Sequence, residues 1–373
     1  MAPVILLRHA ESRINDVQVR VYDVPTDYPE ADGTLAWNAT TVILATIRCG
    51  GYEGMGYSYA HRAAASIIAA PLRECLVGAS PMDIPTLWMD MNRSLRNIGR
   101  PGTGLMAISA VDHALWDLKA RMLGVSVVHL MGRAREKIPL YGSGGFTSYD
   151  ITLLQNQLSR FANQGFTRVK MKVGTTPEED PQRVAAVREA IGKDTSLMVD
   201  ANGAYTREQA VAMAETFAHH DVSWLEEPVS SDDLEGLRWI RDHVPGGMQV
   251  AAGEYGWDTD YFRRMLAHEA VDVLQIDSTR CGGFTGFIKA AALAEGYHIP
   301  VSAHCSPHLH AHVCSSVGQL DHVEYFYDHA RIEAIFFDGL PVLAGGALTV
   351  DAEQPGLGMT LKQKDVDRYL VAA

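Results

Sequence analysis

The pattern of apolar and polar residues changes about one third of the way along this chain. Before residue 130, two strand-like apolar runs at 17–24 and 41–49 enclose a segment, 25–38, that is rich in proline, aspartate and glycine. Apolar residues at helical spacing then predict helices over about 62–77, 82–98 and 104–123. Strands followed by helices are typical of an α+β domain, which we place at residues 1–132.

Beyond this domain, short apolar runs alternate with helix-length amphipathic stretches. Eight runs have the length of buried strands, at 138–141, 169–173, 197–200, 223–226, 250–254, 271–277, 301–304 and 323–325. Eight such strands with helices between them fit a (β/α)7–8 barrel of the TIM type. An open doubly wound sheet is the alternative, but no G-x-G-x-x-G follows the first strand. We therefore predict a barrel over residues 133–330 and a turn-rich C-terminal segment, 331–373, that packs back on the N-terminal domain.

Composition and charge narrow the class of protein. The chain has 373 residues, of which 47% are hydrophobic, and a formal net charge of −13 without any run of basic residues. This balance gives no support for nucleic acid or a membrane surface as a partner. Five widely spaced cysteines without C-x-x-C argue against disulfides or a zinc knuckle. The short apolar stretch at 4–7 is too brief for a signal peptide or a membrane span, so we expect a cytoplasmic protein.

Ionisable residues stand at the ends of almost all the predicted barrel strands. Because side chains alternate along a strand, Lys170 and Lys172 share one face. The carboxyl ends of barrel strands converge on one mouth. The other charged residues at these strand ends are Asp200, Glu226, Glu254, Asp277, His304 and Glu324. One site would then hold two amines, several carboxylates and a histidine.

Each of these residues has a simpler explanation when it is taken alone. A K-x-K on a strand is commonly a solvated face, a glutamate after a strand is commonly a helix cap, and a single histidine is commonly structural. Seven charged strand ends together require a counter-ion, because like charges crowded in one mouth cost several kcal/mol. Asp200, Glu226 and Glu254 are separated by 26 and 28 residues, about one βα unit each. Their hard oxygen ligands favour Mg²⁺ or Mn²⁺ over zinc.

The ordered motifs resemble those of the enolase superfamily, and the K-x-K with a later Asp/His pair resembles its mandelate racemase subgroup. The resemblance extends over nearly the whole chain and includes the helical stretch S-A-V-D-H-A-L-W-D at 109–117, which is similar to the family's capping domain. The barrel motifs are K-M-K at 170–172, V-D-A-N at 199–202, W-L-E-E-P at 224–228, G-E at 253–254, Q-I-D at 275–277, S-A-H at 302–304 and V-E-Y at 323–325.

The resemblance implies a role for each matching residue. Asp200, Glu226 and Glu254 would hold one Mg²⁺ per subunit, for which Mn²⁺ could substitute, and the metal would bind a substrate carboxylate. Lys172 would be one base for the α-proton. His304, oriented by Asp277, would be the other. Lys170 would support the charge of the enolate, and Glu324 would form a hydrogen bond to it. We also expect the ammonium of Lys170 and the metal to depress the pKa of Lys172.

Four further residues are candidates for substrate binding. They are Asn202, Arg280, His308 and Tyr57. Arg280 could equally form a structural ion pair. His308 and His312 have helical i, i+4 spacing, but the absence of H-E-x-x-H favours loop or first-turn residues over a zinc site. We expect residues 25–37 and 50–61 to close over the metal as a lid. The cysteines at 305 and 314 are interpreted as packing residues.

The function that these residues predict is removal of the α-proton from a small hydroxy-carboxylate. Loss of a β-hydroxyl from an acid sugar, which yields a 2-keto-3-deoxy acid, is the preferred reaction because the predicted lid is polar. The alternatives are racemisation or epimerisation of a 2-hydroxy acid and lactone cycloisomerisation. A barrel that only binds its ligand would not need two opposed bases. The family resemblance also implies a homo-oligomer.

Overall fold

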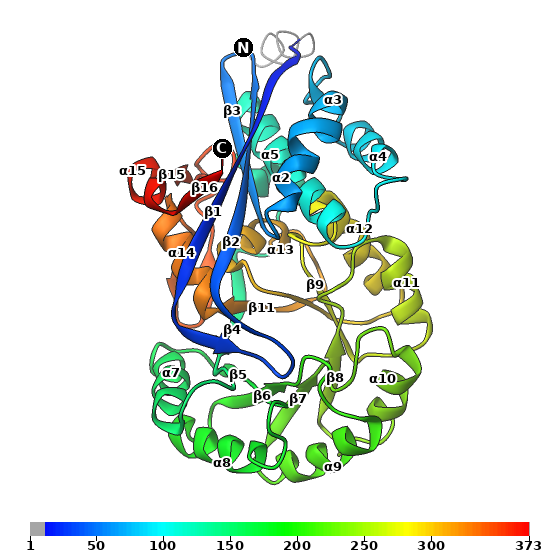
Figure 1. Cartoon of the computed structure of the whole chain (residues 1–373), viewed down its shortest axis with the longest axis vertical. Helices are drawn as coiled ribbons and strands as arrows, with labels where there is room; N and C mark the ends of the chain where they lie inside the picture. Colours follow the sequence, from blue (N-terminus) through cyan, green and yellow to red (C-terminus); the bar gives the residue numbers. More distant parts are fainter. Residues whose placement is uncertain (1–11, 373) are drawn as a thin grey trace.

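The structure is a computed structural model that describes residues 12–372, so the apolar stretch at 4–7 lies outside the described residues. Figure 1 shows an elongated molecule with long antiparallel strands at one end and a ring of strands surrounded by helices at the other. Among residues 12–372, no helix combines the length and the apolar composition needed to cross a membrane.

The N-terminal part is an antiparallel sheet covered by helices. Its strand order is β16-β1-β2-β3, with bounds β1 Ile14–Ala31, β2 Ala36–Cys49, β3 Tyr52–Tyr59 and β16 Leu370–Ala372. The covering segment contains α2 Ala63–Ile67, the π-helical turn η1 Ile68–Leu72, α3 Arg73–Leu76, α4 Ile84–Ser94, α5 Thr103–Leu123 and α6 Val127–Met131. Alternate residues of β1 and β2 pack against these helices in a core of their own.

Two strand regions of this part go beyond the runs that the sequence predicts. Much of the proline-, aspartate- and glycine-rich stretch 25–38 extends the two strands, because β1 runs to Ala31 and pairs there with β2 through Glu30↔Trp37 and Ala31↔Ala36. A register shift between Pro25 and Glu30 accommodates the missing N–H of the proline within the ribbon. Residues 52–59 form a strand that the glycine-rich sequence does not predict, because β3 pairs with β2 along its length.

The predicted TIM-type barrel is confirmed. Eight parallel strands, β4 to β11, follow one another around the ring, and pairing of β11 with β4 closes it. Their bounds are β4 Lys137–Gly144, β5 Arg168–Lys172, β6 Ser196–Asp200, β7 Val222–Glu226, β8 Gln249–Ala252, β9 Val273–Ile276, β10 Val301–Ala303 and β11 Leu320–Phe326. Closure of the ring leaves no free edge among these strands and brings their carboxyl ends to one mouth.

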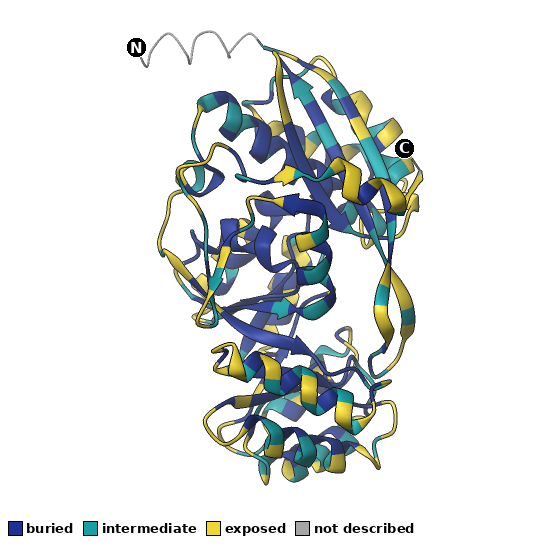
Figure 2. Ribbon diagram, turned by 90° about the vertical axis from the view of Figure 1, so that its left-hand side faces the viewer, coloured by how far each residue is buried: buried dark blue, intermediate teal, exposed yellow. Residues whose placement is uncertain are grey.

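Helices surround the barrel and are amphipathic where they meet solvent. Figure 2 shows buried barrel strands and helices with exposed outer faces. The helices are α7 Ile151–Asn163, α8 Asp180–Ile191, α9 Arg207–Ala218, α10 Leu234–Arg241, α11 Thr259–Ala267, α12 Gly283–Gly296, α13 Pro307–Cys314 and α14 Tyr327–Phe336. The alternation of short apolar runs with amphipathic stretches therefore reflects one repeated βα unit.

The C-terminal segment contacts both parts of the molecule. The short strand β16 pairs with β1 of the N-terminal sheet, whereas β14 (Ala347–Thr349) pairs with the start of β4 in the barrel. The remaining elements are β12 Phe337–Asp338, β13 Val342–Ala344, β15 Thr360–Leu361, α15 Gln363–Val366 and η2 Asp367–Tyr369. The exact domain boundaries stay predictions, and position 330 falls inside α14.

Close packing of β3 against α5 fixes the N-terminal part, and it yields a testable prediction. A Cβ at Gly56 would overlap the backbone of Ala110 and Ala114. We expect Gly56→Ala to lower the free energy of unfolding by about 1–3 kcal/mol, because the backbone of β3 and that of α5 cannot move apart without disturbing the packing between them. Urea denaturation measures the loss. The control is Gly318→Ala, whose Cβ meets no atom within 4 Å; equal stability of the two variants would contradict the prediction.

Candidate active site

The pleat of the barrel strands explains why polar side chains gather at the mouth. Met198 and Trp224 lie in a buried apolar cluster formed by residues of five barrel strands. Two positions further along the same strands stand Asp200 and Glu226, which are also fully buried. Because side chains two apart share a face, the strands that fill the barrel with apolar groups present charged groups above them. The indole of Trp224 also donates to Glu226 Oε2 over 2.8 Å.

The first feature of this mouth is a carboxylate trio. Asp200, Glu226 and Glu254 offer one oxygen each within 4.8 Å of one another, and at most 2% of each residue is exposed. Glu254 Oε2 and the neighbouring Asn202 Oδ1 are buried without a hydrogen-bond partner. Buried carboxylates this close need a cation, and hard oxygen donors without sulfur or nitrogen suit Mg²⁺. The residues present therefore fit the expected metal.

Two lysines face the trio from β5. Lys170 Nζ contacts Glu226 and lies 3.4 Å from Asp200 Oδ2, and Lys172 Nζ lies 2.5 Å from the same oxygen. Burial alone would lower the pKa of Lys172, but the attraction of Asp200 outweighs it and raises the pKa above its ordinary value. The expected depression of this pKa by a bound metal stays a prediction. Lys172 is a cation held by Asp200.

His304 lies on the other side of the mouth and is oriented by Asp277. His304 Nδ1 lies 2.8 Å from Asp277 Oδ2. The other oxygen of this carboxylate, Oδ1, accepts a hydrogen bond from the Thr279 N–H. Burial would raise the pKa of Asp277, but the hydrogen bond from His304 and the positive groups nearby lower it below its usual range. Because the ionised carboxylate accepts from Nδ1–H, the other ring nitrogen, Nε2, is free to exchange protons. It lies 3.2 Å from Glu254 Oε2.

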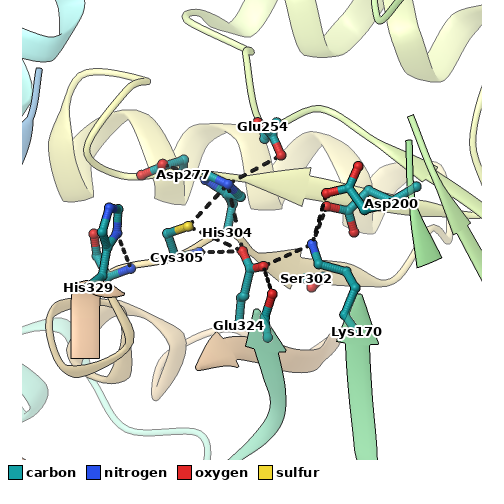
Figure 3. Close-up of polar contacts among 12 residues, drawn as sticks. Lys170, Asp200, Glu254, Asp277, Ser302, His304, Cys305, Glu324 and His329 are labelled. Atoms are coloured by element: carbon teal, nitrogen blue, oxygen red, sulfur yellow. Dashed lines mark hydrogen bonds and ion pairs between the residues drawn. The ribbon is translucent and has the colours of Figure 1, made fainter. Parts of the chain in front are cut away.

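Glu324 connects the two sides of the mouth (Figure 3). Its Oε1 lies 2.9 Å from Lys170 Nζ and accepts from the Ser143 hydroxyl, while its Oε2 accepts from the Cys305 N–H. Burial would raise the pKa of Glu324, but Lys170 brings it well below the ordinary value. Glu324 is therefore a hydrogen-bond acceptor on both oxygens, and it holds Lys170 in place.

A cavity of about 540 Å³ lies over these groups. From the barrel it is lined by Lys172, Asn202, Glu254, Arg280 and His304. The N-terminal part contributes Asp32, Leu35 and Trp37 from the β1–β2 hairpin, whose tip lies over the barrel strands in Figure 1, together with Tyr59 and His61. Of the expected lid segments, residues 32–37 and 59–61 thus reach the cavity. A second hollow of about 510 Å³, lined mainly by residues of α7 and α14, contains none of the predicted catalytic, metal-binding or substrate-binding residues.

Two of the candidate substrate-binding residues do not reach this cavity. Tyr57 donates its hydroxyl to Glu333 Oε1 over 2.6 Å, and His308 Nδ1 lies 2.7 Å from Glu333 Oε2. All three side chains are buried. Together they connect β3 to α13 and α14, which is a structural arrangement. The other two candidates, Asn202 and Arg280, do line the cavity, and Arg280 also pairs with Glu254 Oε1 at 3.1 Å.

The sequence did not indicate several residues that line the cavity. His329 stacks on Tyr59 with 3.5 Å between the ring centroids. Tyr255 lies under the guanidinium of Arg280, 5.0 Å from it. Cys305, interpreted as a packing residue, lines the cavity with its Sγ 3.2 Å from His304 Nε2. All three follow the last residues of barrel strands, the position that should have identified them.

Comparison with known protein families assigns both parts of the chain. Residues 16–132 match the family described as the N-terminal domain of mandelate racemase and muconate lactonizing enzyme. Residues 153–366 match the family described as enolase C-terminal domain-like. The two matches confirm the family that the ordered motifs predict.

Several known proteins are similar to this chain. L-talarate/galactarate dehydratase of Salmonella typhimurium is 32% identical over 87% of this chain and 81% of its own length. Its crystal structure, liganded with Mg and L-lyxarohydroxamate, has a TM-score of 0.89 at 28% identity, covering 98% of this chain and 94% of that one. 3,6-anhydro-alpha-L-galactonate cycloisomerase of Streptomyces coelicolor is 34% identical over 86% of this chain and 89% of its own length. A mandelate racemase/muconate lactonizing enzyme-like protein from Rubrobacter xylanophilus is 49% identical, with a TM-score of 0.94 over 96% of this chain and all of its own.

The hairpin over the cavity carries a buried acid that should make stability depend on pH. Glu30 is 1% exposed and accepts from the Trp37 indole over 2.8 Å. Burial first, and then the charge of Asp328, raise its pKa from 4.5 to about 8. Because the pKa of Glu30 is higher in the folded than in the unfolded protein, its contribution to stability is fully present at a pH below the unfolded pKa. This contribution is lost as the pH rises to about 8. The slope from one group is at most about 1.4 kcal/mol per pH unit.

We expect Glu30→Gln to flatten the decline in unfolding free energy between pH 5 and pH 8, because the amide does not titrate. Urea denaturation across this range measures the effect. The matched control is Glu53→Gln at an exposed position of β3. Its unfolding free energy should change with pH as that of the unmodified protein does. A pH profile unchanged by Glu30→Gln would show that the carboxyl is ionised in the folded protein.

Proposed function

The chain belongs to the mandelate racemase/muconate lactonizing enzyme family of the enolase superfamily, and from that premise we propose that it removes the α-proton of an acid sugar and expels the β-hydroxyl. The product would be a 2-keto-3-deoxy acid. The observation that carries this proposal is that Lys172 and His304, which Asp277 orients, line one cavity beside a carboxylate trio. Removal of a proton next to a carboxylate uses both a proton-transfer group and a cation that stabilises the developing charge.

Substrate binding in this proposal begins with the acid group of the sugar. Asp200, Glu226 and Glu254 would hold Mg²⁺, whose positive charge would stabilise the negative charge that develops on the substrate carboxylate. Arg280 and Asn202 also line the cavity, where they would contact the substrate. The hydroxyl-bearing remainder would meet Asp32, Tyr59 and other polar groups of the N-terminal part. These contacts would determine which sugar fits.

His304 is the best placed proton carrier. Asp277 accepts a hydrogen bond from Nδ1, so Nε2 can take a proton or return one to a leaving hydroxide. A positioned acid or base accelerates a reaction by about 10²–10⁴-fold. Asp277 also stabilises the imidazolium that would form during the transfer.

The two lysines have different surroundings, which suggests different roles. Lys170 is fully buried and is fixed by Glu226 and Glu324, so it remains a cation and supports negative charge on the substrate. Lys172 is 5% exposed at the cavity and is paired with Asp200. Acceptance of a proton by Lys172 requires that this ion pair loosen. We propose that it is the second base, on the side of the substrate away from His304.

A lactone cycloisomerase is the second candidate, and it is favoured by the 32% identity with the D-galactarolactone cycloisomerase of Agrobacterium fabrum. Loss of the α-proton and departure of a β-substituent are common to both reactions. When a free acid sugar loses a β-hydroxyl, one water leaves the molecule. When the β-oxygen belongs to a lactone ring, the ring opens and the product keeps the mass of the substrate. A racemase would return the proton to the same carbon without forming a keto acid.

The carboxylate trio predicts a metal requirement. Glu226→Gln should weaken Mg²⁺ binding and reduce turnover, because one charged ligand is lost; even partners of a ligand are worth about 10–100-fold in metal affinity. Calorimetric titration with Mg²⁺ measures the binding. The exposed Glu215→Gln on α9 serves as the control and should bind Mg²⁺ as the unmodified protein does. Full activity and affinity in Glu226→Gln would disprove the assignment.

The proposed reaction is tested with a library of mono- and diacid sugars and their lactones in D₂O with Mg²⁺. We expect 2-keto acid from one or more free acids, detected as the semicarbazone, with loss of one water by mass spectrometry. Keto acid formed from lactones without loss of mass would favour the cycloisomerase. Deuterium incorporation without keto acid from any compound would favour the racemase.

His304→Asn should abolish keto acid formation, because an imidazolium gives up a proton to the leaving hydroxide more readily near neutral pH than a lysine ammonium does. Any deuterium exchange that survives would be attributed to Lys172. His298→Asn, at an exposed position after α12, should keep full activity. Unimpaired formation of keto acid by His304→Asn would rule out its role as the acid.

A further inference from the structure

A second group of potential metal ligands lies beside the carboxylate trio. His304, Cys305 and Glu324 each offer one ligand atom, and these atoms lie within 4.8 Å of one another. At most 5% of any of these residues is exposed. Figure 3 shows the three side chains next to one another, with Glu324 also linked to Lys170. The proposed function uses His304 and Glu324 but gives no role to the thiol of Cys305.

The spacing of these atoms is that of a tetrahedral zinc site. His304 Nε2 lies 3.2 Å from Cys305 Sγ and 3.7 Å from Glu324 Oε2, and Sγ lies 3.4 Å from the same oxygen. With Zn–S of about 2.3 Å and Zn–N or Zn–O of about 2.0–2.1 Å, tetrahedral geometry places ligand atoms about 3.3–3.6 Å apart. Shifts of a few tenths of an ångström would therefore complete the site.

A carboxylate oxygen without a hydrogen-bond partner lies close to these three ligand atoms. Glu254 Oε2 is buried, has no hydrogen-bond partner and lies 3.2 Å from His304 Nε2. The negative charges of Glu254 and Asp277 favour a cation here, while Arg280, which pairs with both, opposes it in part. Zinc sites commonly have three protein ligands and an open fourth position. Glu254 or a solvent molecule in the cavity could fill that position.

The two ligand groups differ in chemical preference. The carboxylate trio contains only hard oxygen atoms, which suit Mg²⁺, whereas a thiolate and an imidazole select softer ions such as Zn²⁺. Backbone conformation brings the thiol into this position. Cys305 and Ser306 have φ of 55° and 40°, a left-handed conformation that is costly for residues with a side chain. This conformation precedes α13 and lets the Cys305 N–H and Sγ both face Glu324.

We propose that His304, Cys305 and Glu324 form a second metal site, selective for Zn²⁺ and similar soft divalent cations, whose occupation inhibits the enzyme. Binding would displace the thiol proton of Cys305 to solvent and would place the metal on His304 Nε2. The inhibition rests on the proposed function, in which this nitrogen carries the proton. The binding does not rest on it.

Cadmium provides a direct test of binding, because a cadmium–thiolate bond gives an ultraviolet charge-transfer band that carboxylates do not give. The protein is titrated with Cd²⁺ in saturating Mg²⁺, which keeps the carboxylate trio occupied. We expect one Cd²⁺ per chain to produce the band and excess Zn²⁺ to displace it. Loss of an outer partner of a ligand costs about 10–100-fold in metal affinity, so loss of the thiolate itself should cost at least about 100-fold.

Three variants identify the ligands. Cys305→Ser should lose the band, and His304→Asn should weaken Cd²⁺ binding while the thiolate remains. Cys75→Ser is the control, because Cys75 is the one cysteine of this chain that is not buried; it should keep the band. Circular dichroism verifies that each variant is folded. The proposal is overturned if the unmodified protein gives no band, if the band survives in Cys305→Ser, or if it disappears in Cys75→Ser.

Inhibition is measured separately, on any substrate that the library identifies. Micromolar Zn²⁺ added at saturating Mg²⁺ should inhibit the unmodified enzyme, and a chelator should restore its activity. If the library yields no substrate, the proposed function fails while the cadmium experiment still decides whether the second site exists. Cadmium binding at Cys305 without inhibition of an active enzyme would refute the inhibitory role.

Discussion

The burial of like-charged carboxylates at the mouth of the barrel is the constraint on which the rest of this structure depends. Asp200, Glu226 and Glu324 are fully buried, and each contacts Lys170, which is itself fully buried. An uncompensated charge in such a place costs several kcal/mol, so the lysine is needed before any substrate or cation arrives. The pleat that places these residues above the apolar barrel interior also leaves Glu254 oriented toward the cavity. A site ready for a cation follows from the fold itself.

The N-terminal part is fixed to the barrel by buried polar contacts. Asp112 accepts hydrogen bonds from the N–H and hydroxyl of Thr285 at the start of α12. Ser109 accepts from the N–H groups of Gly282 and Gly283 in the loop that follows Asp277. The loop after β9, which carries Arg280 into the cavity, is thereby held against α5. Asp112 and Ser109, which do not line the cavity, therefore help to position the loop that carries Arg280.

The relatives of this chain include dehydratases and cycloisomerases, and the arrangement of the site explains how one framework serves both. Both reactions break a bond at the α-carbon and then release an oxygen from the β-carbon. The proposed proton-transfer groups lie at the ends of barrel strands, whereas another part of the cavity lining comes from the β1–β2 hairpin and from β3. Changes in the N-terminal part can alter the substrate without disturbing the proton-transfer groups.

Local sequence patterns determined the barrel, its strand ends and the set of charged residues at the mouth, because strand alternation and the βα repeat are short-range properties. They did not determine the course of residues 25–38, where pairing between two strands overrides the turn-forming residues. They also did not separate Tyr57 and His308, which bind Glu333 away from the cavity, from His329, which lines it. These positions depend on contacts between residues distant in sequence, and only the packed tertiary structure decides such contacts.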